Sequence, residues 1–252
     1  MRLGRIDVNG AAVWAELDAD GHAHVLRRAP WDGIERTGER VAAAQVRLLA
    51  PAEPSKVVCI GLNYLDHIEE MKHAGPPADP VIFIKPSTSV IGPGQPIVRP
   101  AFSQRVDHEA ELAVVISKRM KDVAEADALS YVLGYTCLND VTARDIQRAD
   151  GQWTRGKGID GFCPIGPWIE TDLSPDDLAI TGKVNGEVRQ QSTTKLLIHP
   201  VAKLLSFISA AMTLLPGDVV STGTPAGVGP MVAGDTVEIE IAGIGILSNP
   251  VR

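Results

Sequence analysis

The sequence predicts a mainly β (α+β) fold, a closed or rolled mixed sheet with a few helices. Brief β-branched or aromatic runs, each ended by turn residues, recur along the chain: KVVCIG, PVIFIK, AELAVVIS, YVLGYTCL, GDVVSTG and TVEIEIAGIGIL. Asn9-Gly10 and Asn185-Gly186 are strong signals for two-residue hairpin turns. Because strands and helices do not alternate, a doubly wound α/β fold is not expected.

One long helix is expected, over the stretch PVAKLLSFISAAMTLL. Pro200 suits its first turn. Its apolar residues follow helical spacing: Val201, Leu204, Leu205, Ile208, Met212 and Leu215.

A domain boundary is expected near residue 54. The first fifty residues carry short alternating segments, and LLAPAEPSK then supplies two prolines. A chain of 252 residues can hold one large domain and a small addition. We therefore expect a small strand-rich N-terminal domain over residues 1–54 and a main, catalytic domain over residues 55–252.

Composition limits the partners. The chain has 24 Lys and Arg against 31 Asp and Glu, a net charge of -7, and no basic run, which argues against a nucleic-acid or anionic-membrane partner. The N-terminus MRLGRIDVNG has Asp7 where a signal peptide would need an apolar stretch, and no apolar run reaches membrane-spanning length, so we expect a soluble, cytoplasmic protein. Cys59, Cys137 and Cys163 match no disulfide or metal motif and are expected to be buried thiols.

Acidic residues mark the start of one predicted strand, in VDHEAELAVVIS. Glu109 and Glu111 lie two residues apart, so their side chains share one face of the strand. Asp140 ends another apolar run, GYTCLN. Three carboxylates suit a hard ion such as Mg²⁺, Mn²⁺ or Ca²⁺. The alternative is a solvated pair of glutamates with Asp140 as a helix N-cap.

Lys157 lies in GQWTRGKG, which has the G-x-x-x-x-G-K skeleton of a phosphate-binding P-loop. Gly158 stands where Ser or Thr should bind Mg²⁺, and the stretch follows a predicted helix rather than a strand, so we reject the nucleotide interpretation. Lys157 then either meets an anion on a Gly-flanked loop or is simply exposed.

Two further patterns admit both a functional and an ordinary explanation. His67 and Glu70 are three apart in LDHIEEM, so on a helix the carboxylate can orient the imidazole as a general base; the alternative is a solvated helix. The Gly-rich loop STGTPAGVGP, residues 221–230, either binds a carboxylate through its N-H groups or only permits tight turns.

The chain resembles the fumarylacetoacetate hydrolase family from about Lys56 to its end. A series of motifs in the family's order carries the resemblance: NYLDHIEEM, IFIKPSTSVIGPG, VDHEAELAVVI, GYTCLNDVTARDIQ, RGKGIDGFCPIGPW, VNGEVRQ and STGTPAGVG. Ile159 departs from the aromatic residue frequent after the Lys-Gly pair, and the extra upstream aspartate of the animal fumarylacetoacetases has no match. Both departures point away from fumarylacetoacetate itself.

The resemblance implies a mixed β roll around a metal site, a homodimer, and a small anionic 2-oxo or 2,4-dioxo acid as substrate. The roles that it implies are these: Mg²⁺, Mn²⁺ or Ca²⁺ bound by Glu109, Glu111 and Asp140; charge stabilisation by Lys157; water activation by His67 with Glu70; and substrate contact by Arg144, Gln147 and the Gly223-Thr224 pair.

Bacterial members of about this size catalyse three reactions through an enolate held by the metal. We expect a hydrolase that cleaves a carbon-carbon bond in an acylpyruvate or fumarylpyruvate, because His67 and Glu70 can activate water. The alternatives are an isomerase of 2-hydroxyhepta-2,4-diene-1,7-dioate (5-carboxymethyl-2-hydroxymuconate), an oxaloacetate decarboxylase and an inactive metal-binding protein. Residues 63–80 contain few apolar anchors and several Gly and Pro, and are predicted to form a mobile lid.

Overall fold

The computed structural model describes residues 1–71 and 75–252. Its largest sheet is built from the strands β1 (Arg2–Val8), β2 (Ala11–Leu17), β3 (Ala23–Leu26), β4 (Arg36–Val41), β5 (Leu48–Leu49), β6 (Lys56–Gly61), β7 (Val81–Pro86), β8 (Val90–Ile91), β10 (Ala110–Ile116), β11 (Val132–Asn139), β13 (Cys163–Glu170) and β16 (Val219–Ser221). The strand order is β4-β3-β2-β1-β13-β11-β10-β16-β6-β7, with β5 on β1 and β8 on β13.

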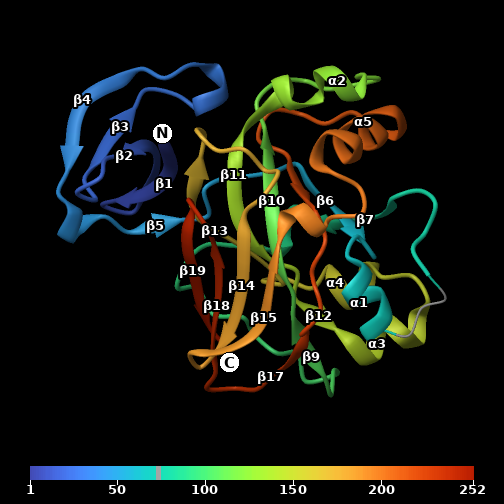
Figure 1. Ribbon diagram of the computed structural model, residues 1–252. Coiled ribbons are helices and arrows are strands. Elements are labelled where there is room, and N and C mark those ends of the chain that lie inside the picture. Colours follow the sequence, from blue (N-terminus) through green and yellow to red (C-terminus); the bar gives the residue numbers. More distant parts are fainter. Residues whose placement is uncertain (72–74) are drawn as a thin grey trace.

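Two smaller sheets complete the β structure (Figure 1). One contains β9 (Val106–His108), β12 (Thr142–Ala143) and β17 (Gly229–Met231) in the order β12-β9-β17. The other contains β14 (Ala179–Val184), β15 (Glu187–Thr193), β18 (Thr236–Ile241) and β19 (Gly245–Pro250) in the order β15-β14-β18-β19. Buried residues of β10, such as Leu112 and Val114, share one apolar core with Ile180 and Ile239 of this sheet. The predicted rolled, mainly β fold is therefore confirmed.

The hairpin signals at Asn-Gly pairs are also confirmed. Asn9-Gly10 joins β1 to β2, and Asn185-Gly186 joins β14 to β15. All four residues have positive φ, between 53° and 84°, which is the conformation that a two-residue turn of this kind requires. The local sequence thus sets the turn of both hairpins, while a β-bulge between Gly182 and Lys183 shifts the register farther along β14.

The helices are short: α1 (Leu65–Glu70), α2 (Glu125–Ala128), α3 (Arg144–Asp150), α4 (Thr154–Lys157) and α5 (Val201–Ala211). Single 3₁₀ turns occur at Pro30–Asp32, Ala43–Gln45, Ser87–Ser89, Leu129–Tyr131 and Thr194–Leu196. Within residues 1–71 and 75–252, no helix combines the length and apolar character needed to cross a membrane.

Helix α5 ends earlier than the apolar spacing predicts. Met212 is extended, with φ -145° and ψ 153°, and Leu214 pairs with Met120 in an isolated β-bridge. Leu214 is fully buried, whereas Leu215 is 37% exposed. The extended segment buries Leu214 in the core, so tertiary packing decides the end of the helix.

The N-terminal strands form a group at one side of the molecule (Figure 1). They are joined to the other strands through β1, in which Arg2 and Leu3 pair with Glu170 and Ile169 of β13. The boundary near residue 54 stays a prediction, and the strand pairing means that the two parts share one sheet.

Hydrogen bonds between the start of β10 and the end of β11 bring the acidic residues together. Glu109 lies in the break between β9 and β10, and Asp140 directly follows β11. The side-chain Oδ1 of Asn139 accepts the N-H of Glu109 at 3.0 Å, and the N-H of Asp140 donates to the carbonyl oxygen of Glu109 at 2.9 Å. Because β10 and β11 pair antiparallel, their neighbouring ends bring these carboxylates to one place.

Candidate metal and catalytic site

The structure brings the three predicted carboxylates together. Glu109, Glu111 and Asp140 are each at most 3% exposed, and each offers an oxygen within 4.8 Å of the other two. The alternative of a solvated glutamate pair is therefore wrong. A carboxylate cluster at this depth is costly unless cations or hydrogen-bond donors compensate it.

Glu111 is held by neutral donors. Its Oε2 accepts from the hydroxyl of Ser221 and from the N-H of Gly223 at 2.8 Å. Gly223 has φ 103°, and a Cβ there would lie 2.8 Å from the Asn63 side chain, so the residue's lack of a side chain permits this approach. The Gly-rich loop thus does bind a carboxylate, and it is one from the protein itself.

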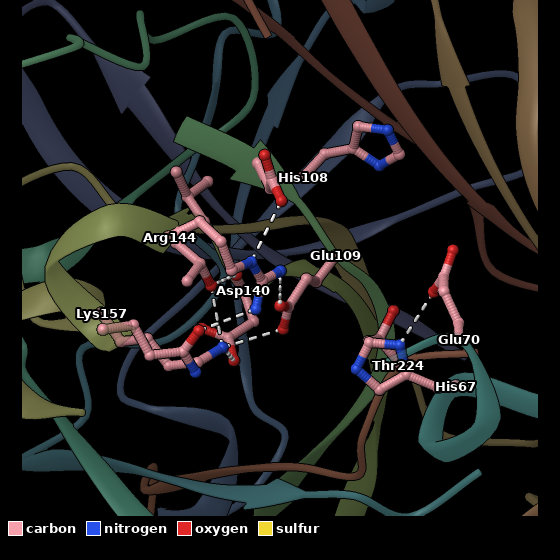
Figure 2. A network of polar contacts seen from close by, with 12 residues as sticks. His67, Glu70, His108, Glu109, Asp140, Arg144, Lys157 and Thr224 are labelled. Atoms are coloured by element: carbon pink, nitrogen blue, oxygen red, sulfur yellow. Dashed lines mark hydrogen bonds and ion pairs between the residues drawn. The ribbon is translucent and has the colours of Figure 1, made fainter. Parts of the chain in front are cut away.

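Lys157 is buried rather than exposed, at 2%. Its Nζ donates to Glu109 Oε2 at 2.8 Å, to Asp140 Oδ2 at 2.6 Å and to Thr142 Oγ1 at 2.8 Å. Figure 2 shows this ammonium group between the two carboxylates. Helix α4, which is too short to bury much apolar area, serves to bring Lys157 to this position.

Arg144, at the start of α3, holds the other side of Glu109 (Figure 2). Its guanidinium donates to Glu109 Oε1, to Asp107 Oδ2 at 3.0 Å and to Gln147 Oε1 at 2.8 Å. Arg144 and Gln147 are therefore both at the site, one turn of helix apart.

Two charged residues of the site, Asp107 and Lys85, were not predicted from the sequence. Asp107 continues the same-face alternation of Glu109 and Glu111 by one more step. Lys85 is fully buried at the end of β7, and its Nζ lies 2.7 Å from Asp140 Oδ1 while also donating to the carbonyl oxygen of Lys157 at 2.6 Å. A lysine inside the apolar run PVIFIK was the available signal, because buried lysines need a partner.

The electrostatic surroundings shift the pKa values of Glu109 and Glu111 in opposite directions. Burial by itself raises the pKa of Glu109, but the Lys157 and Arg144 cations outweigh it and hold that pKa well below its usual value. Burial, followed by the carboxylates of Asp140 and Glu109, raises the pKa of Glu111 well above its usual value. Burial lowers the pKa of Lys157, but Asp140 and Glu109 more than offset this and raise it overall.

His67 and Glu70 form the predicted pair on α1. His67 is 6% exposed, and its Nδ1 lies 3.2 Å from Glu70 Oε2. Glu70 Oε1 in turn accepts the N-H of Gly227 at 3.0 Å. Because this carboxylate accepts hydrogen bonds, Nδ1 of His67 carries the proton and Nε2 is the basic nitrogen. The solvated-helix alternative fails for His67, since this side chain is buried.

One cavity joins these groups. It has a volume of about 30 Å³ and is lined by residues from both ends of the predicted site: Ile60, Gly61, Leu62, His67, Met71, Phe83, Glu109, Glu111, Asp140, Arg144, Gln147, Trp153, Lys157 and Thr224. Such a volume holds no more than a few waters.

The predicted lid over residues 63–80 is anchored at its start. The Asn63 side chain donates to the carbonyl oxygens of His199 and Thr222, and Tyr64 is 1% exposed. Residues 72–74 lie outside the described residues. Any movement of this segment must therefore begin after Tyr64, and the lid stays a prediction.

The residues present fit a hard divalent cation. The three converging ligands are all carboxylate oxygens, the donor type that Mg²⁺, Mn²⁺ and Ca²⁺ prefer. Glu111 has no cation among its described hydrogen-bond partners, and burial together with the carboxylates of Asp140 and Glu109 raises its pKa. A divalent ion would supply the missing positive charge, with Glu109, Glu111 and Asp140 as its ligands.

Comparison with known proteins identifies the family. A family model described as Fumarylacetoacetate (FAA) hydrolase C-terminal matches residues 56–252. The chain belongs to the fumarylacetoacetate hydrolase family. A second model, described as Rv2993c-like, N-terminal, matches residues 1–51.

Two similar solved structures are isomerases by name. The 5-carboxymethyl-2-hydroxymuconate delta-isomerase from Mycobacterium smegmatis is 50% identical with a TM-score of 0.94, over 100% of this chain and 99% of that one. The 2-hydroxyhepta-2,4-diene-1,7-dioate isomerase from Mycobacterium marinum is 51% identical with a TM-score of 0.92, over 100% and 98%.

More distant relatives carry other names. The mitochondrial oxaloacetate tautomerase Fahd2a of Rattus norvegicus is 43% identical over 223 residues, which cover 84% of this chain and 71% of the relative. The maleylpyruvate hydrolase from Sphingobium sp. SYK-6, solved with a manganese(II) ion and pyruvate, is 31% identical with a TM-score of 0.81, over 100% and 98%.

Proposed function

We propose that this enzyme is a divalent-metal-dependent isomerase of 2-hydroxydienoic acids of the 2-hydroxyhepta-2,4-diene-1,7-dioate kind. The observation that carries the proposal is the His67–Glu70 pair, which shares one cavity with the carboxylates Glu109, Glu111 and Asp140. The two isomerases at about 50% identity support this reaction over the hydrolysis expected from the sequence.

In this reaction the 2-hydroxyl group loses its proton, the 2-oxo group forms, and carbon 5 of the diene gains a proton. A bound divalent ion would act as a Lewis acid on the carboxylate end of the substrate. His67, through its basic Nε2, moves the proton, and Glu70 keeps the ring oriented. Lys157 and Arg144 stabilise the negative charge that develops beside the carboxylates.

Hydrolysis of a 2,4-dioxo acid is the second candidate, because the same histidine can take a proton from water. The named maleylpyruvate hydrolase favours it at lower identity. A reaction of oxaloacetate is a third candidate, supported by the tautomerase relative. The reaction could also be decarboxylation of oxaloacetate, which needs no attacking water. An inactive metal-binding protein is disfavoured, since the chain has every metal-binding and catalytic residue that the family resemblance implies.

A substrate panel with Mg²⁺ or Mn²⁺ tests the proposal. Isomerisation removes the dienol absorbance and yields a product of unchanged mass, whereas hydrolysis of an acylpyruvate releases pyruvate and decarboxylation of oxaloacetate releases CO₂. The isomerase proposal predicts turnover of the 2-hydroxydienoate that exceeds the other two activities in kcat/KM. Faster release of pyruvate or of CO₂ would overturn it.

The variant His67→Ala separates the reactions further. Proton transfer and water activation both need the ring, so isomerase or hydrolase turnover should fall by about 10²- to 10⁴-fold. Decarboxylation should be spared much of this loss. His24→Ala is the matched control, because His24 also pairs with a carboxylate, Asp18, at 3.3 Å but lies in the N-terminal strand β3.

The oligomeric state is a separate proposal. We propose a homodimer, as the family resemblance implies, and sedimentation velocity measurements test it. A single species at the monomer mass of 26.8 kDa across micromolar concentrations would contradict it.

A further inference from the structure

Gln190, on β15, is fully buried and has no part in the proposed reaction. Its side-chain Oε1 accepts the N-H of Ala110 at 2.9 Å and lies 3.1 Å from Nδ1 of His108. Its Nε2 donates to Thr224 Oγ1 at 2.7 Å and to the carbonyl oxygen of Pro225 at 2.8 Å. This one amide therefore joins the segment that carries Glu109 and Glu111 to the Gly-rich loop.

The backbone fixes which end of this amide is which. A backbone N-H can only donate and a carbonyl oxygen can only accept, so Ala110 requires the amide oxygen and Pro225 requires the amide nitrogen. Reversing the amide would set two donors against each other at Ala110 and two acceptors at Pro225. Nδ1 of His108 must then donate to Gln190 Oε1, which also fixes the tautomer of this buried ring.

The fixed orientation of the Gln190 amide also fixes the direction of the Thr224 hydroxyl proton. Its oxygen accepts from Gln190 Nε2, so its proton is directed to the other neighbour, the carbonyl oxygen of Ala110, at 2.9 Å. A hydroxyl has one proton and two lone pairs. With the proton and one lone pair engaged, Thr224 retains a single lone pair, and Thr224 lines the cavity.

We propose that Gln190 is a positioning residue that fixes Thr224 as a hydrogen-bond acceptor toward the cavity, so that the site favours a ligand whose 2-oxygen carries a proton. A hydroxyl or enol group can donate to this lone pair. A keto oxygen presents only lone pairs and gains nothing from it. Thr224 thereby becomes a specificity-determining residue for the hydroxy form of a 2-oxo acid.

This polarity agrees with the proposed reaction, in which the 2-hydroxyl is the group that gives up its proton. The ligand class is the only element taken from the proposed function. Binding can be measured without turnover, so failure of the isomerase proposal and failure of this one are separate results.

The test compares two ligands of equal charge, pyruvate with its keto oxygen and lactate, as both enantiomers, with its hydroxyl group. Affinities of the Mn²⁺-loaded protein are measured by titration calorimetry, after Mn²⁺ affinity itself has been measured for each variant. Thr224→Val removes the hydroxyl and keeps the shape, and Thr224→Ser restores a hydroxyl. Gln190→Met removes the amide and keeps the length.

The chain offers a matched control in Thr222→Val. Thr222 is also fully buried, and its hydroxyl also donates to a backbone carbonyl, that of Leu112, at 2.9 Å. It does not line the cavity. The same chemical change two residues away should therefore leave both ligand affinities as they are.

We expect Thr224→Val to weaken lactate binding relative to pyruvate binding by about fivefold, the scale of one hydrogen bond. Thr224→Ser should restore the ratio, and Gln190→Met should lower it while adding no further change in the Thr224→Val background. Equal weakening of both ligands, a larger loss for pyruvate, or the same ratio change in Thr222→Val would overturn the proposal. If Gln190→Met does not fold, the Thr224 and Thr222 variants still decide between these outcomes.

Discussion

Replacement of Lys157 by Met should destabilise the metal-free protein and make its stability depend on a divalent ion. The Lys157 ammonium donates to Glu109 at 2.8 Å and to Asp140 at 2.6 Å, and it is 2% exposed. Removing one partner of a buried ion pair leaves charge unpaired and costs about 3–5 kcal/mol. Arg144 still pairs with Glu109 and Lys85 with Asp140, so the lower end, about 3 kcal/mol, applies.

Thermal unfolding measures this loss. For a chain of 252 residues, 1 kcal/mol corresponds to about 2–4 °C, so Lys157→Met should unfold about 6–12 °C lower in the presence of a chelator. Mn²⁺ at 100 times its dissociation constant stabilises a protein by about 2.7 kcal/mol. Because the variant lacks a competing cation, its Mn²⁺-induced shift should exceed that of the parent. Turnover should nevertheless fall by about 10²- to 10³-fold, since a preorganised charge is lost.

Lys183→Met is the control for this prediction. The Lys183–Glu240 pair has the same 2.8 Å separation as Lys157–Glu109, but both side chains are partly exposed, at 26% and 42%. Such a surface pair contributes at most about 1 kcal/mol. If Lys157→Met lowered the unfolding temperature no more than Lys183→Met, Lys157 would not be the buried counter-ion of these carboxylates.

Three further predictions concern the same cavity. Glu109→Gln should weaken Mn²⁺ binding by about 100-fold or more, measured by calorimetry, because even partners of metal ligands change affinity 10- to 100-fold; unchanged affinity would remove Glu109 from the ligand set. Because burial raises the pKa of Glu111, protons compete with Mn²⁺ for this ligand, so Mn²⁺ affinity should rise with pH and proton release should appear in buffers of different ionisation enthalpy; a pH-independent affinity would contradict this. Protease cleavage between residues 63 and 80 should slow when Mn²⁺ and oxalate are bound, and equal cleavage rates would argue against the lid.

Much of the site could be predicted because it follows from local geometry. Alternation along a strand put Glu109 and Glu111 on one face, and helical spacing put His67 beside Glu70. The donor type alone indicated a hard metal ion. Asp140 and Lys157 stood out in their own segments, but only the family motifs placed them with the glutamates, because nothing local in the sequence brings these residues together.

Tertiary structure decided what local periodicity cannot. Lys157 is buried between two carboxylates only because α4 packs against β7 and β12, and Lys85 reaches Asp140 from β7, more than fifty residues away along the chain. The N-H groups of Gly223 and Gly227 bind Glu111 and Glu70. Periodicity reports which side of an element a residue occupies, whereas the partner of a buried charge is set by which elements pack together. The sequence therefore determined the kinds of chemical group at this site, and long-range packing determined how those groups are paired.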